Sequence, residues 1–169
     1  MTIRSELAAD RMAVRAVHQA AFDRDGEGNL VDVLRERAAP LVSLVADDSG
    51  SIVGHILFSP VTLSGHPDAK IMGLAPMAAL PARQREGIGS ALVRAGLDTC
   101  GPLGVDAVVV VGHPEYYPRF GFLPASQFGL SCEYDVPDDV FMALELRVGA
   151  LAGQNGTIRF HPAFAEVGV

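Results

Sequence analysis

Two glycines one residue apart stand directly before a stretch with helical apolar spacing. The stretch is PARQREGIGSALV, Pro81–Val93, and its glycines are Gly87 and Gly89. Glycine has no Cβ, so an anion can approach its backbone closely, and the free N–H groups at a helix start favour negative charge. No Lys-Ser/Thr pair follows, as a Walker A loop needs, and Leu92 stands where a dinucleotide fingerprint has its third glycine. The pattern indicates a different phosphate-binding loop, or a plain turn whose glycines supply a positive φ.

The segments on either side of this loop indicate how it is held. Ile71–Leu80 is apolar throughout and predicts a buried central strand. Val105–Gly112 (VDAVVVVG) is apolar enough to be buried on both faces. A strand, a helix and a strand in this order form a crossover unit, so the two strands should be parallel. Pro76 cannot donate to a sheet ladder, so we expect a bulge or a kink in the first of them.

The rest of the chain predicts strands and helices in one continuous order. A strand at Thr2–Leu7 precedes a helix whose buried face would carry Ala13, Ala16, Val17, Ala20 and Ala21. A turn at Asp23–Gly28, a short helix ending before Pro40, and a hairpin of Leu41–Asp47 with Ser51–Leu63 follow. Val140–Val148 and Gly156–Phe160 are the predicted closing strands. No linker of domain size interrupts this order, so residues 1–169 are expected to form a single domain.

Composition narrows the class of protein. The chain has 169 residues, 49% of them hydrophobic, and a formal net charge of −7, without the basic patch of a nucleic-acid-binding protein. The first residues are charged, and the longest apolar run, Ala107–Val111, is short, so the sequence predicts no membrane span and a cytoplasmic protein.

The cysteines and histidines do not form a metal-binding pattern. Cys100 and Cys132 are isolated, and His18, His55, His66 and His161 lack mutual metal-ligand spacing. We therefore expect no metal, and histidines that lie on the surface or bond locally.

Two motifs resemble those of one enzyme superfamily. Gln84–Gly89 (QREGIG) matches the Q/R-x-x-G-x-G/A motif of the GNAT acyl-CoA-dependent N-acetyltransferases, and Tyr117–Phe122 (YPRFGF) resembles their Tyr-x-x-x-Gly-Phe segment. The longer VVGHPEYYPRFGFLPA resembles a bacterial branch of predicted acetyltransferases. The resemblance implies an α/β (α+β) fold with a mixed, mostly antiparallel central sheet flanked by helices. Ile71–Leu80 and Val105–Gly112 would be its parallel, splayed pair.

The resemblance also implies acetyl-CoA as the cosubstrate. The family pattern places the coenzyme on a group of backbone positions: Met77, Ala78, Ala79, Arg85, Glu86, Gly87, Ile88, Gly89 and Ser90. The last six would contact the pyrophosphate, and the first three would pair with the pantetheine arm. Glu86 is a negative charge in this loop, so its side chain should point away from the phosphates.

Tyr117 is the expected general acid. Direct attack of an amine on the thioester expels a thiolate, and transfer from an ordinary phenol to that thiolate is uphill by about 2 kcal/mol. The alternative is a purely structural role, in which the Tyr117 ring packs against a turn. Glu27, expected in the loop between the first two helices, would hold the acceptor amine, and Pro124–Asp139 would also line its pocket. The general base stays open between Glu27, His113 and a water relay.

The predicted function is direct transfer of an acetyl group from acetyl-CoA to a primary amine on a small molecule or peptide. A non-catalytic acyl-CoA-binding sensor or regulatory module is the alternative, and a nucleotide-binding redox domain is a third. No nucleic acid or membrane partner is expected, and the C-terminal strands are candidate surfaces for a homodimer.

Overall fold

The computed structural model describes residues 1–169. The strands are β1 (Thr2–Ser5), β2 (Val42–Asp48), β3 (Ser51–Leu63), β4 (Ile71–Ala79), β5 (Ala107–Val111), β6 (Leu123–Pro124), β7 (Leu130–Cys132), β8 (Phe141–Glu145) and β9 (Gly156–Arg159). The α-helices are α1 (Arg11–Phe22), α2 (Gly26–Arg37), α3 (Ile88–Cys100) and α4 (Ala163–Val167). Short 3-10 helices join several of these, including Tyr117–Phe120.

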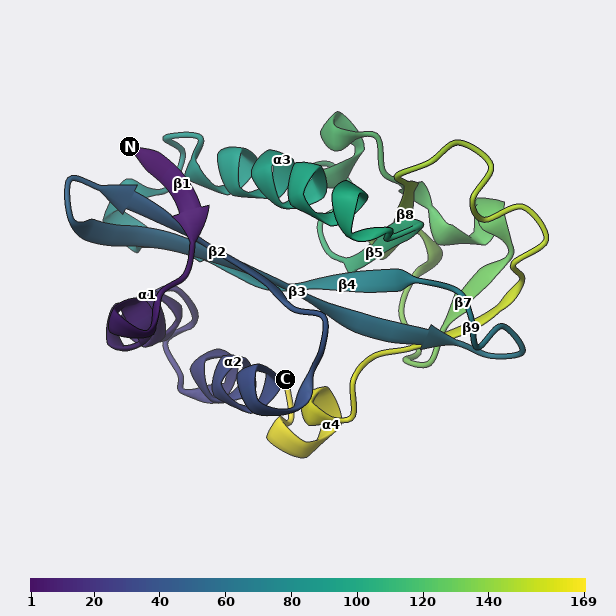
Figure 1. Cartoon of the computed structure of the whole chain (residues 1–169), viewed down its shortest axis with the longest axis horizontal. Helices are drawn as coiled ribbons and strands as arrows, with labels where there is room; N and C mark the ends of the chain where they lie inside the picture. Colours follow the sequence, from purple (N-terminus) through teal and green to yellow (C-terminus); the bar gives the residue numbers. More distant parts are fainter.

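The sheet is mixed and mostly antiparallel, as predicted. Its order is β1-β2-β3-β4-β5-β8-β6, and β9 extends it by pairing with β3 and β7. Only the β4–β5 and β7–β9 pairs are parallel. Helix α3 covers one face of the sheet, while α1, α2 and α4 cover the other (Figure 1). No helix is both long and apolar enough to cross a membrane.

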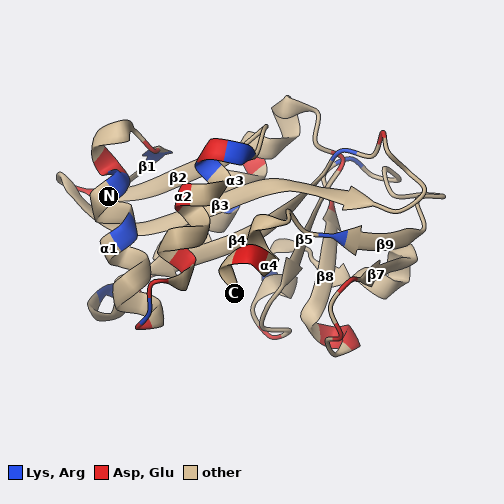
Figure 2. Cartoon of the chain, turned by 90° about the horizontal axis from the view of Figure 1, so that it is seen from below, with Lys and Arg blue, Asp and Glu red and all other residues tan.

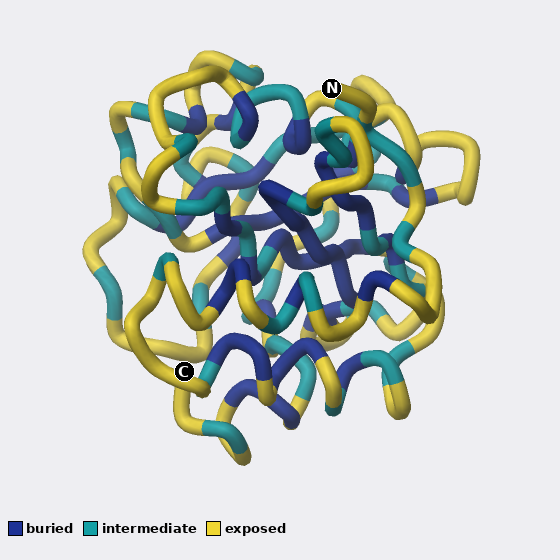
Figure 3. Tube along the Cα trace, turned by 90° about the vertical axis from the view of Figure 1, so that its left-hand side faces the viewer, coloured by how far each residue is buried: buried dark blue, intermediate teal, exposed yellow.

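Each face of the sheet has its own core. Phe58, Leu92 and Phe122 belong to the cluster under α3, and Leu34, Leu57 and Phe164 to the cluster under α1, α2 and α4. The buried residues run through the middle of the molecule (Figure 3). The long strands β3 and β4 carry no Lys, Arg, Asp or Glu, and the charges lie mainly on helices and loops (Figure 2). Burial of two apolar faces therefore fixes the strands between the helix layers.

Strand β4 contains the irregularity that Pro76 predicted. Opposite β3 its pairing jumps from Met77↔Ile56 to Leu74↔Phe58, so β4 has one residue more than its partner across this step. Such a bulge bends a strand. On the other side, parallel pairing with β5 ends at Gly73↔Val109, and Leu74–Ala79 have no partner there. The splayed parallel pair is thus confirmed, and its open edge begins just before the bulge.

Several sequence-based expectations differ from the structure. Helix α2 begins at Gly26, inside the predicted turn, because the glycines there adopt helical backbone conformations. On α1 the buried residues are Val14, Val17 and His18, whereas Ala16 and Ala20 are exposed. The predicted face was wrong because small alanines tolerate both sides of a helix. The short β6, β7 and α4 carried too little periodicity to be predicted.

Helix α3 can approach the sheet closely because it has a glycine at position 96. A Cβ built there would lie 2.2 Å from Cε1 of Phe58, a core residue of β3. We expect Gly96→Ala to lower the free energy of unfolding by about 1–2 kcal/mol, since overpacking outweighs the gain in helix propensity. Urea denaturation measures this. Gly101→Ala, where a Cβ meets nothing within 4 Å, is the matched control and should leave the midpoint unchanged. Equal midpoints for both variants would contradict the packing account.

Candidate active site

A cavity of about 590 Å³ lies between the end of β4 and the start of α3. It is lined by Ala21, Phe22, Met77, Ala78, Ala79, Arg83, Gln84, Arg85, Gly87, Ile88, Gly89, Ser90, Tyr116 and Arg119. All the predicted coenzyme-binding residues except Glu86 are in this set. Gly87 caps α3 with φ +84°, a conformation that suits glycine, and Arg85 has φ +67°. The free N–H groups of the first helical turn thus lie at a cavity wall.

The arginines around this cavity differ in whether their charge is already paired. Arg83 bonds Asp48 and Glu86, each at 2.9 Å. Arg85 and Arg119 have no ion pair with any carboxylate of the chain, so their charge is available to an anion. The Glu86 side chain turns to Arg83 rather than into the cavity, as expected. Sequence reasoning missed Arg119, although it lies within the Tyr117–Phe122 motif.

Tyr116 closes part of the same cavity against the helix start. Its hydroxyl is hydrogen-bonded to that of Ser90 at 3.1 Å, and the Arg119 guanidinium lies 4.4 Å from its ring centroid. A Cβ at Gly89 would lie 3.1 Å from the same hydroxyl. Gly89 therefore lets Tyr116 approach the helix, while Gly87 supplies the turn, so the two glycines have different physical roles.

A second cavity of about 360 Å³ adjoins the first, and Phe22 and Met77 line both. It lies at the gap between β4 and β5. Its lining is mostly apolar and consists of Phe22, Glu27, Leu30, Leu74, Ala75, Pro76, Met77, Val111, Gly112, His113, Tyr117, Phe164 and Val169. Tyr117, Glu27 and His113, which come from three distant parts of the sequence, are thus brought to one space.

Tyr117 is buried, with 7% of its surface exposed, and its hydroxyl has no hydrogen-bond partner in the chain. Its ring fills the space that a side chain at Gly112 would occupy. Burial, helped by Tyr116, raises the pKa of Tyr117 to about 12. The phenol therefore stays protonated at neutral pH, but it is a weaker acid than the value near 10 assumed from sequence. Transfer to a thiolate costs about 5 kcal/mol rather than 2.

Glu27 lies in the first turn of α2, not in a loop, and it is buried with 5% exposure. Both of its carboxylate oxygens accept hydrogen bonds from Arg24. Burial acts to raise the pKa of Glu27, but the hydrogen bond and charge of Arg24, a backbone hydrogen bond and the effect of His18 together outweigh burial, and the pKa is lowered. Glu27 is therefore ionised at neutral pH, suited to holding a cation and poorly suited to keeping a proton.

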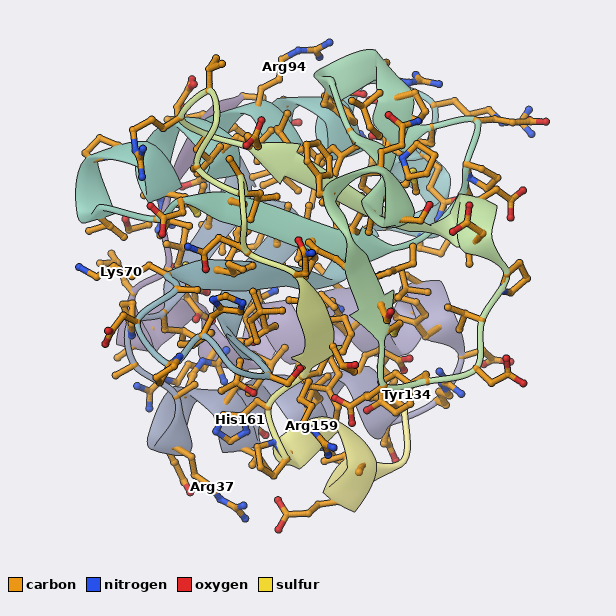
Figure 4. All side chains as sticks on the ribbon, turned by 90° about the vertical axis from the view of Figure 1, so that its right-hand side faces the viewer. Arg37, Lys70, Arg94, Tyr134, Arg159 and His161 are labelled. Atoms are coloured by element: carbon orange, nitrogen blue, oxygen red, sulfur yellow. The ribbon has the colours of Figure 1, made fainter.

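The segment Pro124–Asp139 does not reach the second cavity, which corrects the expectation that it lines the acceptor pocket. Glu133, Tyr134 and Asp135 line a separate hollow of about 450 Å³ beside β7. Tyr134 stacks on Phe160 with ring centroids 5.8 Å apart. Figure 4 shows Tyr134 near Arg159 and His161, at the β7–β9 end of the molecule. The sheet extension carries this segment away from the gap between β4 and β5.

A helix start with unpaired arginines, next to an open strand edge and a second cavity with a buried phenol, defines a class of enzyme. This class binds a phosphorylated, extended acyl carrier and passes its acyl group to a second substrate. Residues 10–122 match the model of the Acetyltransferase (GNAT) family. The chain belongs to this family and is an acetyl-CoA-dependent N-acetyltransferase.

Named relatives agree with this assignment along nearly the whole chain. The uncharacterized N-acetyltransferase YhbS of Escherichia coli K12 is 36% identical over 165 residues, covering 97% of this chain and 98% of its own. The crystal structure of YhbS with CoA matches with a TM-score of 0.91 at 34% identity, covering 97% and 91% of the two chains. A GNAT acetyltransferase of Brucella melitensis, in complex with acetyl-CoA, matches with a TM-score of 0.80 at 36% identity, covering 96% and 97%.

We expect the arginines without an ion pair, Arg85 and Arg119, to contribute to the affinity for the coenzyme. Arg119→Gln removes from the larger cavity a guanidinium that has no carboxylate partner, although its Nε donates to the Tyr116 carbonyl oxygen. A lost charge-assisted contact costs about 1.5–3 kcal/mol. We expect the Kd for CoA to rise about tenfold or more, measured by isothermal titration calorimetry. Arg159→Gln, on β9 at the far end of the sheet, makes the same charge change and should alter Kd less than twofold. Equal effects of the two substitutions would show that only net charge matters.

Proposed function

We propose that the enzyme transfers the acetyl group of acetyl-CoA directly to a primary amine, with Tyr117 as general acid to the departing thiolate. The observation that carries this proposal is the junction of the two cavities at Phe22 and Met77. Tyr117, whose hydroxyl has no hydrogen-bond partner in the chain, lines the smaller cavity together with these two residues. A carrier in the larger cavity and an amine in the smaller one would meet there.

The larger cavity has the groups that a coenzyme A molecule needs. The pyrophosphate would bind at the first turn of α3, where N–H groups, the helix dipole, Arg85 and Arg119 favour an anion. The amide groups of the pantetheine arm would pair with the open edge of β4 at Met77, Ala78 and Ala79, in place of the missing strand partner. The thioester then lies at the gap between β4 and β5.

The chemical step needs no covalent enzyme intermediate. The amine nitrogen attacks the thioester carbonyl, a C–N bond forms, and the C–S bond breaks to leave a thiolate. Tyr117 gives its proton to that sulfur, and the raised pKa keeps the proton in place until the charge develops. A cost of about 5 kcal/mol in this step is small against the barriers of typical enzymes. An N–H bond of the acetylated nitrogen breaks as the amide forms, and the proton released there balances the one that Tyr117 regains before the next turnover.

The smaller cavity indicates the acceptor class. Its apolar lining and about 360 Å³ suit a small or narrow group, and the ionised Glu27 provides one negative charge for an ammonium. The acceptor is therefore a primary amine on an apolar or slender carrier, either a small molecule or the end of a peptide. Because Arg24 shares the Glu27 carboxylate, the attraction is weaker than that of a free carboxylate.

Acetyl-CoA consumption over a panel of primary amines, read by thiol release, tests the function. The panel includes alkylamines, diamines, amino sugars and peptides with free N-termini. We expect release with at least one slender amine. Tight acetyl-CoA binding with no release from any amine would instead identify a non-catalytic acyl-CoA-binding module.

Replacing one hydroxyl tests the general acid. Tyr117→Phe keeps the ring packing against Phe122 and Gly112 but removes the proton. We expect kcat to fall at least 100-fold, the size of a general acid contribution, with the Kd for CoA within twofold of wild type. Tyr116→Phe is the matched control and should lower kcat less than fivefold. A Tyr117→Phe enzyme with wild-type kcat would remove Tyr117 from the chemistry.

A further inference from the structure

Behind the smaller cavity lies a chain of buried polar groups that connects α1 to the edge of the sheet. His18 Nε2 lies 2.7 Å from His55 Nδ1, and His55 Nε2 lies 2.8 Å from Ser43 Oγ. Ser43 donates to Glu6 Oε1 at 2.9 Å, and Arg35 pairs with Glu6. His18 and His55 are fully buried, which corrects the expectation of surface histidines for these two, although each is bonded locally.

The hydrogen bonds of this chain have only one consistent direction. The Ser43 hydroxyl has a single hydrogen, which it donates to the Glu6 carboxylate, so His55 must donate to Ser43 from Nε2. A neutral His55 then has a bare Nδ1, which accepts from Nε2–H of His18. A neutral His18 is left with a bare Nδ1. That atom is buried and has no hydrogen-bond partner.

The bare nitrogen belongs to a ring one side chain behind the cavity wall. The His18 ring stacks on Phe22, with centroids 6.0 Å apart, and Phe22 lines both cavities. Glu27, which lines the smaller cavity, is close enough to act on the pKa of His18 and raises it against the effect of burial. A buried lone pair without a donor is a costly arrangement, so its persistence beside a reaction site calls for an explanation.

We propose that His18 Nδ1 accepts the proton that the acceptor amine loses, received through the Glu27 carboxylate, and that His55, Ser43 and Glu6 position it for this role. The inference rests on the proposed acetyl transfer. One N–H bond of the ammonium breaks as an O–H bond forms at Glu27. At rest Arg24 holds both oxygens of Glu27, and Nδ1 of His18 has no hydrogen-bond partner. Protonation removes the negative charge that Arg24 pairs with, so the neutral carboxyl turns to His18, where its O–H bond breaks as an N–H bond forms at Nδ1. The resulting imidazolium keeps its Nε2–H bond to His55, so no hydrogen bond in the chain has to be remade. After the product leaves, the proton returns by the same route to the open cavity.

The energies allow this role. Burial lowers the pKa of His18 to about 4, with Glu27 opposing and Arg35 adding to the effect. The equilibrium for moving a proton there from an ammonium of pKa near 10 is unfavourable by about a factor of 10⁶. That step alone would still permit on the order of 10⁶ events per second, well above typical kcat values. His18 therefore holds no proton at rest, and it serves as a transient acceptor.

Few charged groups face the two imidazoles. Glu27 and Arg35 approach from α2, and Glu6 approaches through Ser43. Strand β4, which runs beside His55, has no ionisable residue. Because the pKa of His18 lies near 4, His18 stays neutral above about pH 5, and any pH dependence near neutrality belongs to the amine.

His18→Gln tests the acceptor role, because its amide can still donate to His55 but has no basic nitrogen. With an amine found active on wild type, we expect kcat at pH 7 to fall at least tenfold. At pH 9.5, where more of the bound amine is already neutral, the deficit should shrink below threefold. A structural role would give the same deficit at both pH values, and that result would overturn the inference.

Ser43 and Ser59 supply a matched pair of serine variants on adjacent strands. Ser43→Ala breaks the chain and should lower kcat at pH 7 at least fivefold, while Ser43→Thr keeps the hydroxyl and should restore it. Ser59 is buried on β3 with an unpartnered Oγ, outside the chain, so Ser59→Ala should leave kcat unchanged. Equal kcat values for Ser43→Ala and Ser59→Ala would count against the chain.

Histidine ¹⁵N chemical shifts test the chain without any activity. In the wild-type protein at pH 7 both His18 and His55 should carry hydrogen on Nε2 and a bare Nδ1. Hydrogen on Nδ1 of either ring overturns the inference and leaves the acetyl transfer untouched. Absence of thiol release by wild type with every amine overturns the acetyl transfer, and the proton-acceptor role with it.

Discussion

The incomplete pairing of β4 is the constraint on which the site depends. The strand pairs with β5 only as far as Gly73, and one extra residue bends it opposite Ile56 and Phe58. An unpaired strand edge inside a protein leaves donors and acceptors that need partners. The unpaired residues of β4 line the two cavities, so their backbone N–H and C=O groups are accessible to a ligand that has amide groups of its own. The part of β4 beyond Gly73 has no partner on the β5 side, and this is the edge that we propose binds the pantetheine arm.

The features that could be predicted from sequence are those that the backbone imposes. Pro76 cannot pair normally in a central strand, and the Gly87 position needs a positive φ, so a bulge and a tight helix start follow from residue types alone. Ile71–Leu80 and the strand near Val105–Gly112 are apolar on both faces, which predicts burial and a parallel pair. The predicted fold class and the predicted coenzyme-binding loop both rest on such local rules, and the resemblance to the family motifs connected the two predictions.

The features that could not be predicted depend on contacts between distant residues. Arg83 pairs with Glu86, three residues away, but also with Asp48, which is 35 residues away in the chain, whereas Arg119 has no carboxylate partner. The contact with Asp48 cannot be predicted from the residues around Arg83. The burial of His18 follows from the packing of α1 on β3, whereas its neighbours in sequence suggested an alanine face. Glu27 seemed to be a loop acid because glycines on both sides of it imitate a turn. In each case tertiary packing decides the environment, and the environment decides the chemistry.

Burial keeps both the proposed proton donor, Tyr117, and the proposed proton acceptor, His18, in their neutral forms. It raises the pKa of Tyr117 and lowers those of His18 and His55, so all three groups are neutral near pH 7. A neutral phenol can give a proton, and a neutral imidazole can take one. The reaction proposed for the gap between β4 and β5 needs one group of each kind, because the amine loses protons while the sulfur gains one. Burial in a low-dielectric interior therefore does not make these groups inert. It keeps the proton on Tyr117 and keeps His18 unprotonated until charge develops on the reacting substrates.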